Sequence, residues 1–518
     1  MTEATQIIDR SLQKVVGGTG IAFLGTIIAL LLALANRTLV ARFFTQDEYG
    51  IYSLAIVIFN ILVAVAILGL QGGTPRQIAF HRGNKDEAKV RGIIRSSIVL
   101  AAIASVILSL ALFFASDAIS THIFHIPELT PALRIICIGI PFAVLLVIFT
   151  SIFRGFGRVA PRVYFNDILR NALFLLALGV IVLLSSSFIG IMYAFIAAAG
   201  LACLGFALYM IKKMPLSLRN SEGSRPVMRE LLLFSLPLLG SSMLILIIHW
   251  TDTLMLGYFE DSEVVGLYNG ALPLAQVIPV TLTSMGFIYV PVASRLYSRG
   301  HTEELKRSYQ VLTKWIFSLS LPVAMLLLLF PDTILSLFFG SDYAEAALAL
   351  RLLSLGLLVH TFLGANGMSL LVFGRTKLVM WAGLIGASLN VVLNATLIPS
   401  LGITGAAIAS MVSYFAINAF RSITLYRISG IHPFTWNYLK PLIASGIVIS
   451  IIYVIASNLL TVEYWMLPLF FILFLVIYGM CLLLTKSFDD EDIRLLLAIE
   501  RRTGVDATPI KNILRKFV

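Results

Sequence analysis

Apolar runs of about 20 residues recur along the chain, and short polar stretches separate them. A run of this length is what an α-helix needs to cross the hydrocarbon core of a bilayer. The pattern therefore predicts an all-α polytopic membrane protein with about 14 transmembrane helices. The expected spans lie near residues 15–42, 50–70, 93–115, 131–153, 165–185, 187–211, 230–258, 264–290, 311–331, 345–373, 378–397, 403–426, 440–460 and 464–485.

The composition agrees with this pattern. Of 518 residues, 59% are hydrophobic and 13% are charged, whereas soluble domains have roughly 45–50% and about 25%. A soluble enzyme is thereby excluded. The three cysteines, Cys137, Cys203 and Cys481, all lie in apolar segments and are expected to be free thiols, since their spacing suits neither a disulfide framework nor a zinc site.

The distribution of charge predicts the orientation. The net charge is +11, and all but five of the 38 Lys and Arg residues fall in the termini and in every second connection. The intervening loops carry acids, such as Glu260 and Asp332, but no basic residue. Because cytoplasmic loops retain Lys and Arg, both termini are expected in the cytoplasm of a multi-pass cell-membrane protein. Basic residues placed this way face anionic lipid, and nucleic acid is not an expected partner.

Five basic residues break the rule because they lie within the expected spans or at their edges. A charge at this depth costs a few kcal/mol unless it reaches the interface, pairs with another group or faces water. These residues are Arg37, Arg42, Arg134, Arg170 and Arg351.

An internal repeat relates two halves of the chain at an offset near 216 residues. Gly50 and Tyr52 match Gly266 and Tyr268, and the motif FGR at residues 156–158 returns at 373–375. Chance similarity between Leu-rich helices would not keep register this long. The repeat is also far longer than the 20 to 50 residues of solenoid proteins.

The repeat predicts the domain organisation. Six spans separate the copies, and an even number leaves both halves in the same orientation, related by a pseudo-two-fold axis along the membrane normal. The substrate cavity is expected between these two six-helix lobes. The expected parts are an N-terminal lobe (1–211), a cytoplasmic linker (212–229), a C-terminal lobe (230–427), two additional spans (428–485) and a cytoplasmic amphipathic tail (486–518).

The start of the chain resembles a known family. The run GTGIAFLGTIIALLLALANRTLVARFF after Gly17 and the run LGLQGGTPRQIA at Leu68–Ala79 look like the opening of the polysaccharide flippases. These belong to the multidrug/oligosaccharidyl-lipid/polysaccharide exporter superfamily. The resemblance covers spans one to twelve.

That resemblance implies a V-shaped transporter that works by alternating access. Its expected substrate is a polyprenyl- or dolichol-linked oligosaccharide, which moves head group first through a cationic cavity to the outer leaflet, for surface polysaccharide or glycan biosynthesis. The motif is diagnostic for the family and does not identify the glycan or the lipid carrier. Membrane lipids are further expected partners, and a monomer is expected.

Arg37 is the first candidate for substrate binding, because it lies about two turns inside the end of its span. A guanidinium in a low-dielectric cavity suits bidentate binding of a lipid phosphate. The alternative is a structural arginine that reaches outward to the interface. Its repeat counterpart is Asp252, so an ion pair at an outer gate is one hypothesis; a local partner for His249 or a backbone cap is the other.

The remaining candidates are less specific. Asp167 and Arg170, three residues apart, are expected to pair on one helical face, with head-group entry as the alternative role. Arg134 and Arg351, which are repeat counterparts, are expected to reach the interface. Uncharged polar residues within spans suit either sugar hydroxyls or contacts between helices: Asn36, Asn60, Asn171, Asn269, Gln276, His360, Asn366, Asn390 and Asn394.

Neither a cofactor nor a metal is expected. His122 and His125 lack a third ligand nearby, and the chain has no GxxxxGK[ST] loop for ATP. The acidic run at 489–492 is expected to cap a helix. Energy for transport would come from an ion gradient (H⁺ or Na⁺), the membrane potential or a downhill lipid gradient.

Two other functions remain open. A small-molecule antiporter of the same superfamily would share the lobes but favour an apolar or acidic pocket. A membrane glycosyltransferase or polymerase would act on the same lipids, yet the outer loops offer no clustered acids for a metal-bound sugar nucleotide or a general base. No catalytic residue is therefore expected, and the chain is expected not to be an enzyme.

Overall fold

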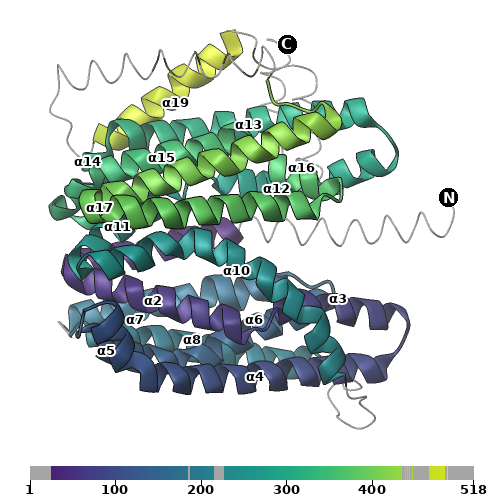
Figure 1. The fold of residues 1–518 in the computed structure, drawn as a ribbon, viewed down its shortest axis with the longest axis vertical. Coiled ribbons are helices and arrows are strands. Elements are labelled where there is room, and N and C mark those ends of the chain that lie inside the picture. The colour runs from purple at the N-terminus through teal and green to yellow at the C-terminus, as the bar shows by residue number, and fades with distance from the viewer. Residues whose placement is uncertain are drawn as a thin grey trace. The chain divides into compact units, whose positions relative to one another are not determined.

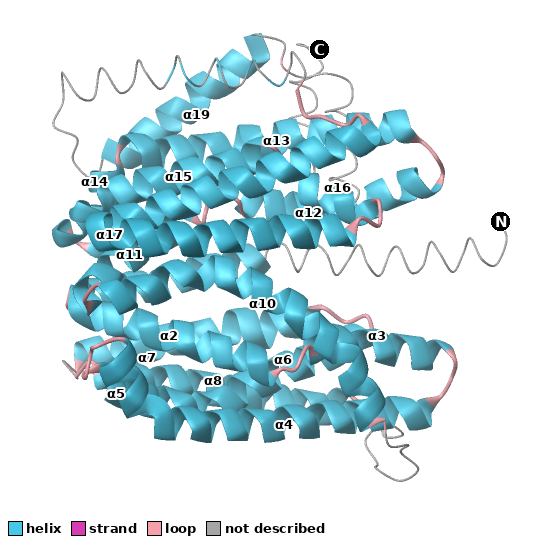
Figure 2. Ribbon diagram, in the orientation of Figure 1, coloured by secondary structure: helices cyan, strands magenta, loops and turns pink. Residues whose placement is uncertain are grey.

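The computed structural model describes residues 25–184, 187–214, 227–434 and 466–484, together with a few single positions between 438 and 448 and at 487. Helices form nearly all of this part of the chain, and no strand occurs in it (Figure 2). Contacts divide the chain into two compact units, Met1–Gly266 (unit 1) and Leu267–Val518 (unit 2). Each unit is a bundle of long helices.

Unit 1 begins with the helix Gly25–Phe43, and Figure 1 shows the labelled helices that follow it. The helix α6 packs against α3, α4 and α8, and α8 packs against α7. The helix α10 also belongs to this unit, because it packs against α2, α3 and α4. The elements are α2 (Gln46–Ala66), α3 (Leu70–Gly83), α4 (Glu87–Ala118), η1 (Ile119–Ile123), α5 (Leu129–Ile136), η2 (Cys137–Gly139), α6 (Ile140–Gly155), η3 (Arg162–Leu169), α7 (Arg170–Leu183), α8 (Ile189–Lys213) and α10 (Met228–Phe259).

Unit 2 follows from within α11 (Ser262–Ala275). Its helices pack in sequence, α12 on α13, α13 on α15 and α15 on α17. A buried apolar cluster around Tyr289 and Tyr309 forms part of its core. The elements are α12 (Val280–Ser298), α13 (Thr302–Leu329), α14 (Pro331–Phe339), η4 (Ser341–Ala346), α15 (Ala347–Phe362), α16 (Asn366–Val372), α17 (Thr376–Ser429) and α19 (Met466–Leu484).

The helices agree with a multi-pass membrane protein. Within the described residues, nine helices are long and apolar enough to cross a bilayer, or ten if the bent pair α11 and α12 is counted as one span. Six of them match the first six expected spans. The helix α17 contains two expected spans, which Gly402 separates with its non-helical backbone (φ 52°, ψ −129°).

Some expectations fall outside the described residues. Most of expected span 440–460 and nearly all of the tail at 486–518 lie there, and so do residues 215–226 of the expected linker. The total of 14 helices therefore stays a prediction. The expected domain boundaries also stay predictions; the division by contacts falls at Gly266, because α10 packs with the first half.

The repeat is visible in matching local structure. The FGR motifs end α6 and α16 in the same way, with left-handed glycines at Gly157 (φ 74°) and Gly374 (φ 71°). The amide after each glycine closes the turn: the N–H of Arg158 donates to the carbonyl of Phe153 (3.0 Å), and that of Arg375 to Leu370 (2.8 Å). Glycine adopts this conformation without a Cβ clash, which explains its place in both copies.

Candidate functional site

Arg37 lies within the first membrane-spanning helix, six residues before that helix ends at Phe43. Its side chain is half-buried. The guanidinium is close enough to α2 to interact electrostatically with Tyr49 and Tyr52. Arg37 therefore lies inside its helix and near two buried aromatic rings.

Tyr52 has a second arginine beside it. Arg170, the first residue of α7, also acts electrostatically on this ring. The ring of Tyr52 stacks on Phe174 of α7 at 6.5 Å between centroids, which holds α2 against the helix that carries Arg170. Two guanidinium groups from separate helices therefore lie near one tyrosine. We call Arg37, Tyr52 and Arg170 the arginine site.

A chain of amide contacts fixes the helix of Arg37 against α7. The side-chain amide of Asn36 donates to the carbonyl of Asn171 at 3.1 Å, and the amide of Asn171 donates to the carbonyl of Asp167 at 2.8 Å. Asn36 is 4% exposed, and its Oδ1 is buried without a hydrogen-bond partner. Asn36 therefore leaves one buried acceptor beside the arginine site.

The partner of Asp167 differs from the sequence-based expectation. Its carboxylate pairs with Arg162 at 3.4 Å and accepts from the amide of Asn166 at 2.7 Å; the expected ion pair with Arg170 does not form. The reason lies in η3, which is a π-helix. A π-helix aligns residues five apart, so Arg162 and Asp167 share a face. Arg170 still senses the carboxylate electrostatically.

Aromatic packing holds η3 in place. Phe165 stacks on Phe206 of α8 at 4.8 Å between centroids, and Phe153 of α6 stacks on the same ring at 5.6 Å. On the opposite side, a side chain at Gly25 would collide with Val163, so the first helix approaches η3 closely. These contacts fix the start of α7 and with it the backbone of Arg170.

The arginine site has a surplus of positive charge. Within the described part of the chain, neither Arg37 nor Arg170 makes an ion pair or a hydrogen bond. A guanidinium withdrawn from water and left without a counterion costs several kcal/mol. The arrangement therefore favours an anion that brings oxygen acceptors to both groups.

The other predicted residues are dispersed. Asn60 lies two turns beyond Tyr52 on α2 and is half-buried. Asp252 on α10 is 4% exposed, His249 on the same helix is exposed, and no Arg37–Asp252 ion pair forms in this structure. Asn269 belongs to unit 2, where it is buried. The structure thus brings together Asn36, Arg37, Asp167 and Arg170 but not these four.

Arg134 and Arg351 have local partners, and their expected reach to the interface stays a prediction. The Nε of Arg134 donates to Ser116 at 3.1 Å, and the guanidinium lies 5.9 Å from the ring centre of Phe113. Arg351 pairs with Asp332 at 3.6 Å. Each of these two guanidinium groups therefore has at least one side-chain partner.

Two basic residues that the loop pattern assigned to connections lie inside helices instead. Arg421 is part of α17, and Lys314 is part of α13 with 5% exposure. Both residues also lie within the expected spans 311–331 and 403–426, although the charge pattern counts them with the neighbouring connections. A polar residue on the inner face of an extended helix leaves little signal in hydropathy alone.

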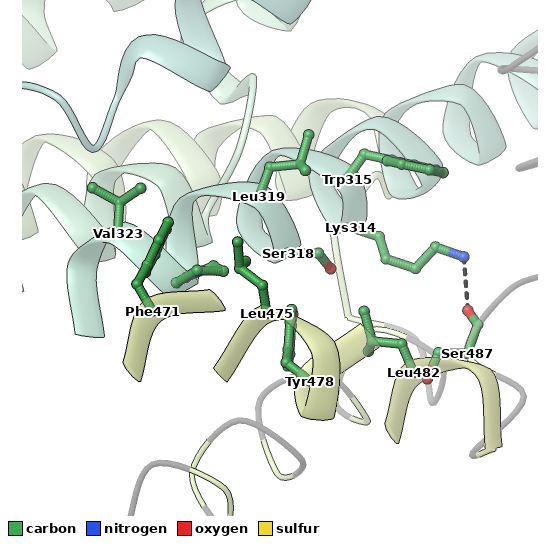
Figure 3. Close-up of a pocket in the computed structure, with 11 residues that line it drawn as sticks. Lys314, Trp315, Ser318, Leu319, Val323, Phe471, Leu475, Tyr478, Leu482 and Ser487 are labelled. Carbon is green, nitrogen blue, oxygen red and sulfur yellow. Dashed lines mark hydrogen bonds between the residues drawn. The ribbon is translucent and has the colours of Figure 1, made fainter. Parts of the chain in front are cut away.

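Lys314 lines a pocket between α13 and α19 in unit 2 (Figure 3). Its Nζ donates to the carbonyl of Ser487 at 3.1 Å. Apart from Ser318 and Ser487, the rest of the wall is apolar or aromatic, and the cavity measures about 260 Å³. The lining residues are Lys314, Trp315, Ser318, Leu319, Pro322, Val323, Phe471, Leu475, Tyr478, Leu482 and Ser487.

Residues 15–297, more than half of the chain, match the family described as polysaccharide biosynthesis protein. The chain belongs to this family. Residues 237–396 also match the MatE family. The residues matched to the first family include all three members of the arginine site.

Similar proteins agree with this assignment. The chain is 32% identical over 201 residues to an uncharacterised membrane protein of Methanocaldococcus jannaschii. The match covers 38% of this chain and 39% of that protein. The chain is 27% identical over 169 residues to a probable low-salt glycan biosynthesis flippase of Haloferax volcanii, covering 33% and 36%. The matched regions thus span less than two fifths of these relatives.

The fold matches a solved transporter over most of its length. The structure of the lipid II flippase MurJ in an inward closed conformation superposes with a TM-score of 0.68, covering 89% of this chain and 98% of that one at 16% identity. This likeness shows the shared fold.

Proposed function

We propose that this member of the polysaccharide biosynthesis protein family is a flippase for a polyprenyl- or dolichol-linked oligosaccharide. The observation that carries the proposal is the arginine site, where two half-buried guanidinium groups lie near Tyr52 and neither makes an ion pair within the described residues. The phosphate that joins glycan to lipid supplies the missing anion. The name of the Haloferax volcanii relative supports the same substrate class.

The residues of the site have separate tasks in this proposal. Arg37 and Arg170 bind the phosphate oxygens, and the planar forks of two guanidinium groups suit such oxygens better than ammonium groups do. Asn36 and Asn171 hold the first helix and α7 together, so the two cations keep their spacing. Transport requires no bond to break, and the chain acts as a transporter without catalysis.

The pocket between α13 and α19 suits the lipid part of the substrate. Its apolar wall and its volume of about 260 Å³ fit a segment of an isoprenoid chain. Apolar lining favours such a chain by about 25 cal/mol for each Å² removed from contact with water.

We further propose that both termini lie in the cytoplasm and that the chain resides in the cell membrane, as the loop charges predict. Transport from the cytoplasmic to the outer leaflet would then place the glycan outside. The energy would come from an ion gradient, H⁺ or Na⁺, from the membrane potential or from the lipid gradient itself.

A small-molecule antiporter is the second candidate, which the match of residues 237–396 to the MatE family favours. Such a transporter for organic cations would need an acidic or apolar pocket. The arginine site has the opposite charge. The two functions therefore differ in the sign of the ligand charge that they accept.

The test uses the full chain in proteoliposomes with a fluorescent lipid-linked oligosaccharide. Loss of fluorescence to a membrane-impermeant quencher reports transfer between leaflets. Arg37→Gln should lower the rate roughly tenfold or more, because it removes charge-assisted hydrogen bonds worth about 1.5–3 kcal/mol, and Arg37→Lys should restore only part of it. Arg351→Lys is the matched control, since Arg351 is exposed and paired with Asp332.

Normal transport by Arg37→Gln would remove Arg37 from the mechanism. Uptake of an organic cation by the wild-type chain, without any transfer of the lipid-linked glycan, would instead support the antiporter.

A further inference from the structure

Arg421 of unit 2 makes no ion pair within the described residues, as is also true of Arg37 and Arg170 in unit 1. Arg421 is part of α17, about two turns before the helix ends at Ser429. Its side chain is half-buried, and its Nε is fully enclosed without a hydrogen-bond partner. Of its nitrogens only Nε is enclosed, and within the described residues the terminal nitrogens form neither an ion pair nor a hydrogen bond. They therefore remain as donors.

The guanidinium rests on a glycine. A β-carbon at Gly367 would lie 3.3 Å from one terminal nitrogen of Arg421 and 3.5 Å from Cζ. The second distance is ordinary van der Waals contact and the first is slightly tighter, so the guanidinium lies directly against the backbone of α16 at residue 367.

A hydrogen-bond network holds α16 against α17 below the guanidinium. The amide of Asn366 donates to Ser422 at 3.0 Å and to Oδ1 of Asn418 at 3.3 Å. The same Oδ1 contacts Nδ1 of His360 at 3.1 Å, and the amide of Asn418 donates to the carbonyl of Tyr414 at 2.7 Å. Asn366 and Asn418 are 1% and 0% exposed. The platform is therefore rigid and prearranged.

Ser422 adds a donor beside the arginine. Its hydroxyl oxygen accepts from Asn366, so its own O–H remains to be donated, and it meets no acceptor within the described part of unit 2. Within the described residues no carboxylate pairs with Arg421. A half-buried cation held this way favours an anion as its partner.

The position of Arg421 in α17 indicates which anion can reach it. Arg421 lies near the end of α17 that precedes a basic connection expected in the cytoplasm, the side where anionic lipid head groups gather. We propose that Arg421, held over Gly367 and flanked by Ser422, is an anion-binding site of unit 2 for the phosphate group of a lipid. Two lipids carry this group, the isoprenoid phosphate of the transported substrate and an anionic phospholipid of the membrane. The proposal does not rest on the function of the arginine site in unit 1.

The test measures binding of two probes to the full chain by native mass spectrometry and titration. One arm uses geranyl pyrophosphate with protein in neutral detergent, and the other uses phosphatidylglycerol in phosphatidylcholine nanodiscs. Arg421→Gln should weaken binding roughly tenfold in at least one arm, because it removes a charge-assisted bidentate contact. Loss in the first arm identifies the isoprenoid phosphate as ligand, and loss in the second identifies the phospholipid.

Gly367→Ala tests the geometry without removing the charge. Alanine favours a helix, so α16 should still form, but the added methyl group would shift the guanidinium by a few tenths of an ångström and should weaken binding less than Arg421→Gln does. Gly383→Ala in α17 is the matched control, because its new methyl group would meet no atom within 4 Å. It should bind as the wild type does.

Unchanged binding of both probes by a folded Arg421→Gln variant would overturn the proposal. Equal binding by the Gly367→Ala and Gly383→Ala variants would also count against it. Because Arg37→Gln reports on the unit 1 site separately, failure of the flippase proposal and failure of this one give different results.

Discussion

Gly50 packs against the residue that is its own counterpart in the repeat, Gly266. A β-carbon at Gly50 would lie 3.0 Å from the amide nitrogen of Gly266 and would collide with the carbonyl of Ser262. Reciprocally, a β-carbon at Gly266 would collide with the carbonyl of Gln46. Because residues 46 and 262 are also counterparts at the offset of 216, the contact is isologous. Two copies of one segment thus recognise each other within unit 1.

The starts of the two segments share further features. Thr45 caps α2, accepting from the N–H of Glu48 at 3.2 Å, and its counterpart Asp261 accepts from the N–H of Val264 at 3.1 Å. The caps fix where each helix begins. The glycines five residues later can then meet backbone to backbone.

Gly50→Ala should therefore destabilise the protein. The new methyl group would meet backbone atoms of the neighbouring helix, which cannot rotate away as a side chain can, and overpacking of this kind costs about 1–3 kcal/mol. The measurement is thermal unfolding of the purified protein in detergent. Gly179→Ala in α7, whose methyl group would meet nothing within 4 Å, should unfold at the wild-type temperature. Equal unfolding temperatures for both variants would contradict the close contact.

Two arginines near the start of α7 should differ in their effect on transport. Arg170→Gln removes one cation of the arginine site and should lower the rate of glycan-lipid transfer roughly tenfold or more. Arg162→Gln removes an exposed partner of Asp167, and exposed ion pairs contribute about 0–1 kcal/mol, so its rate should stay near that of the wild type. Both rates come from the quenching assay. A larger loss with Arg162→Gln would mean that the ion pair matters more than the free cation.

Cysteine labelling should confirm the orientation. In a chain without its three native cysteines, Ser341→Cys should react with an impermeant maleimide from outside, since η4 belongs to a connection without basic residues. Ser221→Cys should react only after the membrane is permeabilised. The reverse pattern would refute the cytoplasmic termini.

Filling the pocket between α13 and α19 should impair binding of the lipid chain. Leu475→Trp adds bulk inside a cavity of about 260 Å³, and displacing an isoprenoid segment should raise the concentration of long-chain substrate needed for half-maximal transfer. A short-chain substrate analogue, which does not need the pocket, should be affected less. Equal effects on both substrates would indicate damage to the fold.

Apolar length and loop charge were sufficient to predict the helices of this fold. The first six expected spans match six helices, and the repeat found by offset reappears in the caps of Gly157 and Gly374. These features are local, since segment length and turn chemistry depend on neighbouring residues. Arg421 and Lys314 were assigned to connections by charge although both lie within expected spans, because charge alone does not show whether a side chain is buried in a helix bundle.

The candidate site was predicted in part. The depth of Arg37 and Arg170 in their spans identified them as unusual, because charge within an apolar run is visible in the sequence. Their shared neighbour Tyr52 was not predicted, since that contact depends on how α2 and α7 pack. The partner of Asp167 was wrong because regular α-helical spacing was assumed for residues that form a π-helix.

The π-helix η3 determines the directions in which the side chains of α7 point. Residues 162–169 make wider turns than an α-helix, and α7 follows without a break at Arg170. Loss of a single residue from this stretch, with the wide turns kept, would rotate the start of α7 by roughly a quarter of a turn. The guanidinium of Arg170 would then leave Tyr52, although every residue that contacts it remained in the chain. The placement of the charge of Arg170 therefore depends on the number of residues in η3 as well as on their identity.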